Sequence, residues 1–230
     1  DRRQRSARLR HRVGHTRRRD HLDRVRHRDV AARPRECFGR ERDRIRTSDH
    51  RRQPGLADAV HLVAGFRALL RIARIESGTH DEAWTDIDLG ALLHDAWELY
   101  HAVGEEKEIT VHLGAAAGRM RGDRDLIFQA VSNLLDNAIK YSPSGSDVRL
   151  EMRDEDGHLT IIVSDQGPGV PEAERGKVLD RFYRTATVTG IPGSGLGLSL
   201  VNAIARHHGG QLILADNAPG LRVLLQLPKT

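Results

Sequence analysis

Two carboxamides in the middle of the chain could do chemistry. Asn133 and Asn137 lie four residues apart in the stretch "SNLLDNAIKYS", which reads as an amphipathic helix, and they fall on the side of the apolar Leu134. Side chains at this spacing share one face of a helix, and an amide that is buried there is costly unless something pairs with it. The pair therefore predicts a polar partner on that face.

A second stretch, "SDQGPGVP", follows an apolar run. It places Asp165 just before Gly167 and Gly169, and glycines let a ligand approach the backbone closely. A strand that ends in a simple turn would also explain this aspartate. By itself the stretch is a weak indication of a binding loop.

A third stretch, "GSGLGLSLV", contains Gly193, Gly195 and Gly197 at the entrance of a predicted helix. The free N–H groups and the positive dipole end of a helix start suit an anion such as phosphate. The chain has no GxxxxGK[ST] phosphate loop, and no GxGxxG motif opens a βαβ unit. If the site binds phosphate, it does so by another arrangement.

Hydrophobic periodicity predicts the elements that position these residues. Helices are predicted at residues 56–76, 88–103, 123–141, 172–179 and 196–208. Strands are predicted at residues 109–113, 147–153, 158–164, 211–215 and 222–227. Because helices and strands mix without regular βαβ alternation, we expect an α+β protein, a two-layer α/β sandwich with a mixed sheet and helices on one face.

The first predicted helix has an apolar seam at Leu62, Phe66, Leu69 and Ala73. This 4-3-4 spacing calls for a partner helix. A domain boundary is predicted at residues 77–87, where the helical pattern breaks.

Charge divides the chain into two unlike parts. Residues 1–55 contain 20 Arg, no Lys and 8 acidic residues, whereas the remaining 175 residues contain 17 basic and 24 acidic residues. The single cysteine, Cys37, excludes an intramolecular disulfide framework and favours a reducing compartment. The uncharged run at residues 185–205 is too rich in glycine and hydroxyl residues for a membrane span, and we expect a cytoplasmic chain.

Taken in order, "NLLDNAIKYS", "DQGPGV", "RFYR" and "GSGLGLSLV" resemble the N, G1, F and G2 boxes of the ATP-binding domain of bacterial sensor histidine kinases. These kinases belong to the wider HATPase or GHKL group, which includes gyrase B and MutL. The resemblance covers residues 88–230 and implies the GHKL (Bergerat) ATP-binding fold. It also implies a cytoplasmic part of a sensor whose membrane anchor lies upstream of this sequence.

The resemblance implies roles for the polar residues of the first box. Asn137 would bind the Mg²⁺ that accompanies ATP, with Asn133 beside it. Lys140 would contact phosphate, and Tyr141 would lie against the nucleotide. Without the resemblance, both asparagines could simply cross-link neighbouring loops.

The other boxes imply further roles. Asp165 would accept a hydrogen bond from the adenine amino group, and Gly167 and Gly169 would let the purine lie close to the backbone. Phe182 would anchor the base of a mobile lid at residues 184–194, although it could also be an ordinary core residue. The lid hinge and its phosphate-facing edge would be formed by Gly193, Gly195 and Gly197.

Histidines could serve as metal ligands or as phosphoacceptors. His207 and His208 are adjacent, so on a helix their side chains diverge by about 100° and a shared metal site is not expected. Helix-end electrostatics is the preferred interpretation of this pair. The family also has an upstream hairpin that carries a phosphoacceptor histidine, and residues 56–77 resemble its second helix. His27 is the candidate phosphoacceptor in this sequence, but Arg28 follows it and the family's phosphoacceptor motif does not match.

Three interpretations of residues 1–55 stay open. The segment could be the product of a frameshift in a GC-rich gene, which we prefer, a diverged disordered linker, or a basic arm that binds nucleic acid. With a single aromatic residue, Phe38, and no recognisable binding fold, nucleic acid is the least favoured partner.

The leading functional hypothesis is a sensor histidine kinase of a two-component system. It would bind ATP with Mg²⁺, phosphorylate a histidine on the hairpin of a homodimer, and pass the phosphoryl group to the receiver domain of a response regulator. The alternative is an ATP-binding regulatory or pseudo-kinase module without autophosphorylation, because no clear acceptor histidine is found. An ATP-driven clamp of the gyrase kind and a related serine kinase are less favoured, since the expected glutamate is missing from the first box and a hairpin-like helix is present.

Overall fold

The structure, a computed structural model, describes residues 56–77, 84–155, 157–188 and 190–229. Its helices are α1 (Leu56–Glu76), α2 (Leu89–Glu105), α3 (Arg124–Tyr141), α4 (Gly197–His207) and the 3-10 turns η2 (Glu172–Glu174), η3 (Lys177–Leu179) and η4 (Ala186–Val188). Its strands are β1 (Trp84–Asp88), β2 (Thr110–Leu113), β3 (Arg119–Asp123), β4 (Asp147–Glu155), β5 (His158–Ser164), β6 (Gln211–Asp216) and β7 (Leu221–Pro228). His27, with the other residues of the 1–55 segment, lies outside the described residues.

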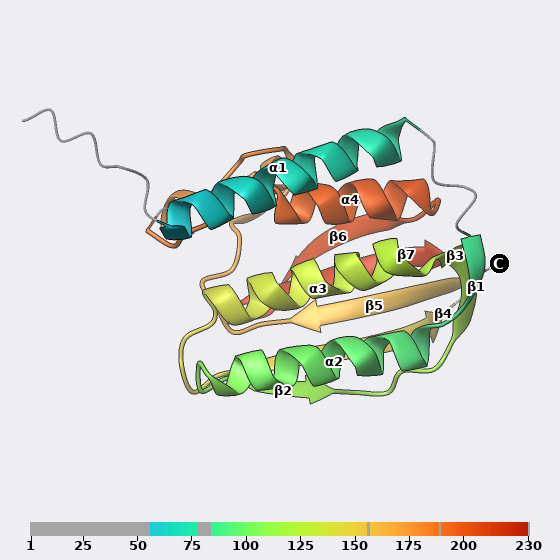
Figure 1. The fold of residues 1–230 in the computed structure, drawn as a ribbon. Helices are drawn as coiled ribbons and strands as arrows, with labels where there is room; N and C mark the ends of the chain where they lie inside the picture. Colours follow the sequence, from blue (N-terminus) through green and yellow to red (C-terminus); the bar gives the residue numbers. More distant parts are fainter. Residues whose placement is uncertain (1–55, 78–83, 156, 189, 230) are drawn as a thin grey trace, which may run out of the picture. The chain divides into compact units, whose positions relative to one another are not determined.

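A five-stranded sheet forms one layer, in the order β2-β4-β5-β7-β6. The pairing of β2 with β4 is parallel, and the other neighbours are antiparallel. Helices α2, α3 and α4 cover one face of this sheet (Figure 1). The predicted α+β sandwich, with a mixed sheet and helices on one face, is confirmed.

Local sequence explains where the two central helices begin. The carboxylate of Asp88 accepts a hydrogen bond from Ala91 N at 3.1 Å, and that of Asp123 accepts one from Leu126 N at 3.0 Å. Each is an N-cap, a feature that stabilises a helix by about 1 kcal/mol. The apolar stripes of both helices are buried against the sheet, which fixes the rotation of α3 and the direction of its polar face.

A two-stranded ribbon was not predicted. Strands β1 and β3 pair antiparallel, with Ile87 opposite Met120 and both side chains buried. The ribbon leads directly into α2 and α3, since Asp88 and Asp123, the two N-cap residues, are its last positions.

The seam predicted on α1 for a partner helix only partly coincides with the face that packs on the rest of the described chain. Phe66 is 61% exposed and Ala73 is also exposed, whereas Ile72 and Ile75 are buried and Leu69 packs against the core. The helix lies along α4 (Figure 1), so the face that is buried in the single chain is the one that meets α4.

The end of α1 also forms an ion pair between exposed side chains. Arg181 donates from one terminal nitrogen to both carboxylate oxygens of Glu76, at 2.5 and 2.6 Å.

Within the described ranges, no helix is both long enough and apolar enough to cross a membrane.

Candidate functional site

A cavity of about 380 Å³ opens between α3, α4, the loop after β5 and the segment before α4. Its volume is typical of a small-molecule site. Of the eleven residues predicted to bind the nucleotide, nine line it: Asn133, Asn137, Lys140, Tyr141, Asp165, Gly169, Gly193, Gly195 and Gly197. The structure therefore brings together residues from three separate motifs.

The two asparagines of α3 face the start of α4. Asn133 donates from Nδ2 to Gln129 O at 2.8 Å, which fixes the orientation of its amide. A Cβ atom built on Gly197 would lie 3.2 Å from Asn137 Nδ2 and 3.8 Å from Asn133 Oδ1. The two helices thus approach closely at a glycine, with both carboxamides at the contact.

Helix α4 begins at this contact without a side-chain cap. Leu196, its N-cap residue, has no side-chain oxygen, and the hydroxyl of Ser199 donates to Leu196 O at 3.0 Å instead of accepting from a backbone N–H. The first N–H groups of a helix attract anions, particularly where no side chain satisfies them. This end of the cavity suits phosphate.

A cation stands beside the helix start. Lys140 Nζ lies 5.0 Å from the centre of the Tyr141 ring, and a Cβ atom on Gly193 would come within 2.5 Å of that nitrogen. Glycine at 193 therefore leaves room for the lysine at the end of the cavity that suits phosphate. The ammonium adds a positive charge to the lining of the cavity.

At another part of the cavity lies a buried carboxylate. Asp165 is 8% exposed, and its Oδ1 accepts hydrogen bonds from Gly167 N at 2.8 Å and Leu221 N at 3.1 Å. Burial raises the pKa of Asp165 above its ordinary value, and these two N–H groups lower it in part. Both backbone bonds use Oδ1, so Oδ2 is left to accept a bond from a ligand.

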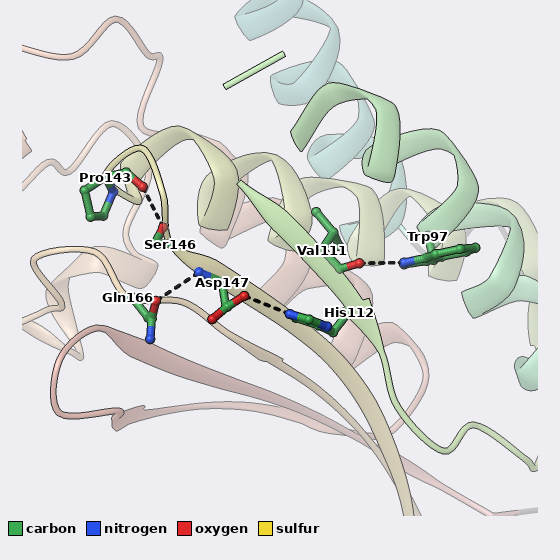
Figure 2. A network of polar contacts seen from close by, with 7 residues as sticks. All are labelled: Trp97, Val111, His112, Pro143, Ser146, Asp147 and Gln166. Carbon is green, nitrogen blue, oxygen red and sulfur yellow. Dashed lines mark hydrogen bonds and ion pairs between the residues drawn. The ribbon is translucent and has the colours of Figure 1, made fainter. Parts of the chain in front are cut away.

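The loop after Asp165 is tied to neighbouring strands by polar contacts (Figure 2). Gln166 Oε1 accepts from Asp147 N at 2.9 Å, and the Asp147 carboxylate lies 2.8 Å from His112 Nε2. Ser146 Oγ donates to Pro143 O at 2.6 Å in the turn before β4. These contacts join the loop to β4 and, through His112, to β2.

Two predicted site residues lie off the cavity. A Cβ atom on Gly167 would come within 2.8 Å of Tyr141 O, so this glycine allows the loop to pack on the end of α3. Phe182 is 61% exposed, which makes the interpretation as an ordinary core residue wrong. Its backbone N–H donates to Gly195 O at 3.0 Å, so it contacts the segment before α4 through the main chain.

Sequence reasoning missed an arginine on the cavity. Arg184 lines it and donates to the carbonyl oxygens of Val188, at 2.7 Å, and Ile191. It is the last residue of "RFYR", so the motif contained a signal for it. Its guanidinium holds a turn of the 184–194 segment together.

His208 has a structural role that was not expected. Its Nε2 accepts from Asp123 N at 3.1 Å, its Nδ1 donates to Ile204 O at 2.8 Å, and its ring stacks on Trp84 at 5.3 Å. Burial lowers the pKa of His208, so the ring is neutral at neutral pH and is not the helix-end charge that was predicted. Among the described residues, no group of three metal-ligating side chains occurs.

The part of the chain that contains this cavity is similar to known ATPase domains. Residues 122–230 match the family described as "Histidine kinase-, DNA gyrase B-, and HSP90-like ATPase". The signal transduction histidine-protein kinase/phosphatase MprB of Mycobacterium leprae is 41% identical over 137 residues, which are 59% of this chain and 26% of that protein. The chain thus spans about a quarter of the length of this curated relative.

Solved structures give the same assignment. The mycobacterial sensor histidine kinase MprB is 35% identical, with a TM-score of 0.55, over 63% of this chain and 96% of that one. Full-length ShkA in complex with AMPPNP is 25% identical, with a TM-score of 0.65, over 73% of this chain and 36% of that one. The second of these was solved with an ATP analogue bound.

Proposed function

This chain belongs to the bacterial sensor histidine kinases with a C-terminal ATP-binding domain, and on that premise we propose that it binds ATP as the Mg²⁺ complex and transfers the γ-phosphoryl group to a histidine. The observation that carries the proposal is the cavity itself. A buried carboxylate and an uncapped helix start with a lysine beside it both line this cavity. The carboxylate suits a purine base, and the helix start with its lysine suits phosphates.

Base recognition falls to Asp165. With Oδ1 fixed by two backbone N–H groups, Oδ2 would accept the hydrogen bond from the 6-amino group of adenine. A carboxylate that is held in place pays little ordering entropy when the base binds, which favours affinity. A base with a carbonyl at this position offers no donor and would be rejected.

Phosphate binding falls to α3 and α4. The amide oxygen of Asn137 suits a hard cation, which takes oxygen ligands and shares those of the phosphates. Lys140 and the first N–H groups of α4 would hold the phosphate oxygens. When bound, Mg²⁺ would neutralise charge on the phosphates; the protein's own contribution is to position them.

The wider function is proposed by analogy with the family. The acceptor would be a histidine on a dimerisation hairpin, of which α1 resembles the second helix, and the phosphoryl group would pass to the receiver domain of a response regulator. We expect the chain to act as a homodimer and in the cytoplasm, where ATP and the regulator are found. His27 stays the candidate acceptor within the sequence.

Nucleotide binding is tested with Asp165→Asn. Asparagine can still accept both backbone bonds through its oxygen, but its nitrogen cannot accept from adenine. We expect the affinity for ADP, measured by titration calorimetry, to fall about tenfold to hundredfold. Asp86→Asn makes the same charge change at an exposed residue of β1, away from the cavity, and should leave affinity unchanged. Equal ADP affinity in Asp165→Asn and the unaltered chain would refute the assignment.

Phosphoryl transfer needs its own assay. The chain is incubated with ATP labelled on the γ-phosphate, and acid-labile, base-stable label on the protein indicates phosphohistidine. His27→Ala should abolish the label if this residue is the acceptor. ADP binding without any such label would support the alternative, a nucleotide-binding module without autophosphorylation.

A further inference from the structure

The turn between β6 and β7 packs directly against Asp165. Asp165 N donates to Leu221 O at 2.9 Å, and Leu221 N donates back to the Asp165 carboxylate at 3.1 Å. A Cβ atom on Gly220 would overlap the carbonyl oxygen of Asp165, so only glycine allows this approach. Residues 216–220, "DNAPG", are therefore part of the surroundings of the carboxylate.

One side chain of this turn reaches the aspartate. Asn217 Nδ2 donates to the main-chain oxygen of Asp165 at 2.7 Å. Asn217 Oδ1 accepts from a terminal nitrogen of Arg222 at 2.9 Å, and Asn217 N donates to Gly220 O at 3.2 Å. Because arginine has donors only, this bond defines which end of the amide is the oxygen and which end must donate to Asp165.

Arg222 is held in turn by the strand that precedes Asp165. Its Nε donates to Ser164 Oγ at 3.3 Å, and Ser164 lies opposite Arg222 in the pairing of β5 with β7. Asn217 itself is absent from the lining of the cavity. Any effect that it has on a ligand is therefore indirect, through Asp165 or through Leu221, which follows the turn and lines the cavity.

We propose that Asn217 is a positioning residue for nucleotide selection, which holds Asp165 so that its Oδ2 faces the 6-amino group of an adenine base. The inference rests on the proposed function. The carboxylate is fixed by two backbone bonds on Oδ1, and the main chain of the same residue is fixed by Leu221 and Asn217. Asn217 supplies the side-chain bond in this set, so its loss lets the aspartate turn.

The test uses two substitutions of Asn217 and a matched control. Asn217→Ala removes both of its side-chain bonds, whereas Asn217→Asp keeps an acceptor for Arg222 and replaces the donor to Asp165 with a carboxylate oxygen, which repels the main-chain oxygen there. The control, Gln211→Ala, removes a bond between Gln211 Nε2 and Gln226 Oε1 of 2.7 Å, which joins β6 to β7 at the other end of the same hairpin. All three chains are compared with the unaltered one in their affinities for ADP and for inosine diphosphate, which lacks the 6-amino group.

We expect both Asn217 variants to bind ADP about fivefold to tenfold more weakly, because the adenine bond depends on the aspartate's position. Their affinity for inosine diphosphate should stay within about twofold, so the preference for ADP falls by nearly the same factor. Gln211→Ala should keep the preference of the unaltered chain. A residue that merely stabilised the turn would change both affinities together.

Each other outcome decides a separate question. An unchanged ADP preference in both Asn217 variants overturns the inference alone. Should Asn217→Ala fail to fold, Arg222→Ala at an exposed position tests the same contact, with an expected loss of about twofold to threefold in ADP preference. If the unaltered chain binds ADP and inosine diphosphate equally, the inference is overturned while nucleotide binding stands. If it binds neither, the proposed function is overturned as well.

Discussion

The two asparagines of α3 differ in their surroundings, although they lie on one face of the helix. The donor of Asn133 is used by Gln129 O, one turn back along the same helix. Asn137 lies one turn further on, half-buried at the contact with Gly197. Four-residue spacing predicted that the two share a face; the structure adds that this face meets the uncapped end of α4.

Asn137→Ala is expected to remove the Mg²⁺-dependent part of ATP binding. The variant lacks the amide oxygen that would bind the cation, so affinity with Mg²⁺ should fall about a hundredfold, to the level measured in EDTA. Titration with a fluorescent ATP analogue, with and without Mg²⁺, checks this. Asn202→Ala, on α4 and beside a different cavity, is the control. A Mg²⁺ effect that persists in Asn137→Ala would contradict the assignment.

His208 joins the end of α4 to the start of α3, and this contact should make stability depend on pH. The pKa of the ring is lowered in the folded chain, so the unfolded chain gains a proton first as pH falls through about 6.5. Proton uptake by the unfolded state favours unfolding, and this contribution to stability is therefore present above that pH and lost below it. The groups in contact with the ring are Trp84, His207, Ile204 and Asp123.

His208→Gln is expected to weaken this pH dependence. Glutamine can still accept a bond from Asp123 N but does not titrate. Between pH 7.5 and 5.5 the histidine should cost the unaltered chain about 1 kcal/mol, or about 2–4 °C in the unfolding midpoint. Thermal unfolding followed by circular dichroism at both pH values measures the difference. Parallel pH dependences in the two proteins would show that His208 does not contribute.

At the scale of the elements, periodicity predicted every long helix and the five strands of the main sheet, but missed the β1–β3 ribbon. In "WTDID" only Ile87 is buried, so one strand face has too few apolar residues to show alternation. Its partner, "RMRGD", lies far along the chain and begins with charge. The ribbon depends on pairing between distant segments, which local pattern does not encode.

The candidate site likewise combines residues that local sequence patterns predict with residues that only long-range contacts bring in. Residues within short motifs, such as Asn137, Asp165 and Gly195, could be found from sequence because their spacing is local. Asn217 could not, because it contacts Asp165 across 52 positions and its turn has no recognisable motif. On α1, periodicity gave a seam for a partner helix, whereas packing on α4 buries an adjacent face that the pattern did not distinguish.

The segment before α4 offers a matched pair of glycines. Gly195 has a φ of +70°, and a Cβ atom there would lie 2.8–3.0 Å from three main-chain atoms of Phe182. Gly190 lies in the same segment with no atom within 4 Å of its Cβ position. The first glycine is required by its conformation and its neighbours, whereas the second is not.

Gly195→Ala should therefore displace the segment from the cavity. We expect a loss of about 1–2 kcal/mol in the free energy of unfolding, from backbone strain and the contact with Phe182. ADP affinity should fall about tenfold, because the start of α4 shifts with the segment. Gly190→Ala should match the unaltered chain in both measurements. If Gly195→Ala behaves like Gly190→Ala, the segment is not held as described.

At the scale of the whole chain, charge separates residues 1–55 from the rest of the sequence, whereas packing decides which elements of the described part share one core. Residues 1–55 contain 20 Arg and 8 acidic residues, and the remainder has an excess of acid. The core of the described part includes Ile72 and Ile75 of α1 together with residues of α2, α3, α4 and both sheets. By packing, α1 therefore belongs with the ATP-binding domain, although by family resemblance it belongs to the hairpin.

Two nested deletions separate the contribution of residues 1–55 from that of α1. Removing residues 1–55 should leave ADP affinity and the unfolding midpoint unchanged, since the nucleotide cavity and the core are built from later residues.

Removing residues 1–83 also takes away α1, so the α4 surface that Ile72 and Ile75 cover becomes exposed. We expect this to cost about 2 kcal/mol, or about 4–8 °C in the midpoint. ADP affinity should fall less than about threefold, because Ala68 is the one residue of α1, among those whose side chains the structure describes, that lines the cavity. Calorimetry of all three chains measures both quantities, and a loss of ADP binding on removal of α1 would make that helix part of the nucleotide site.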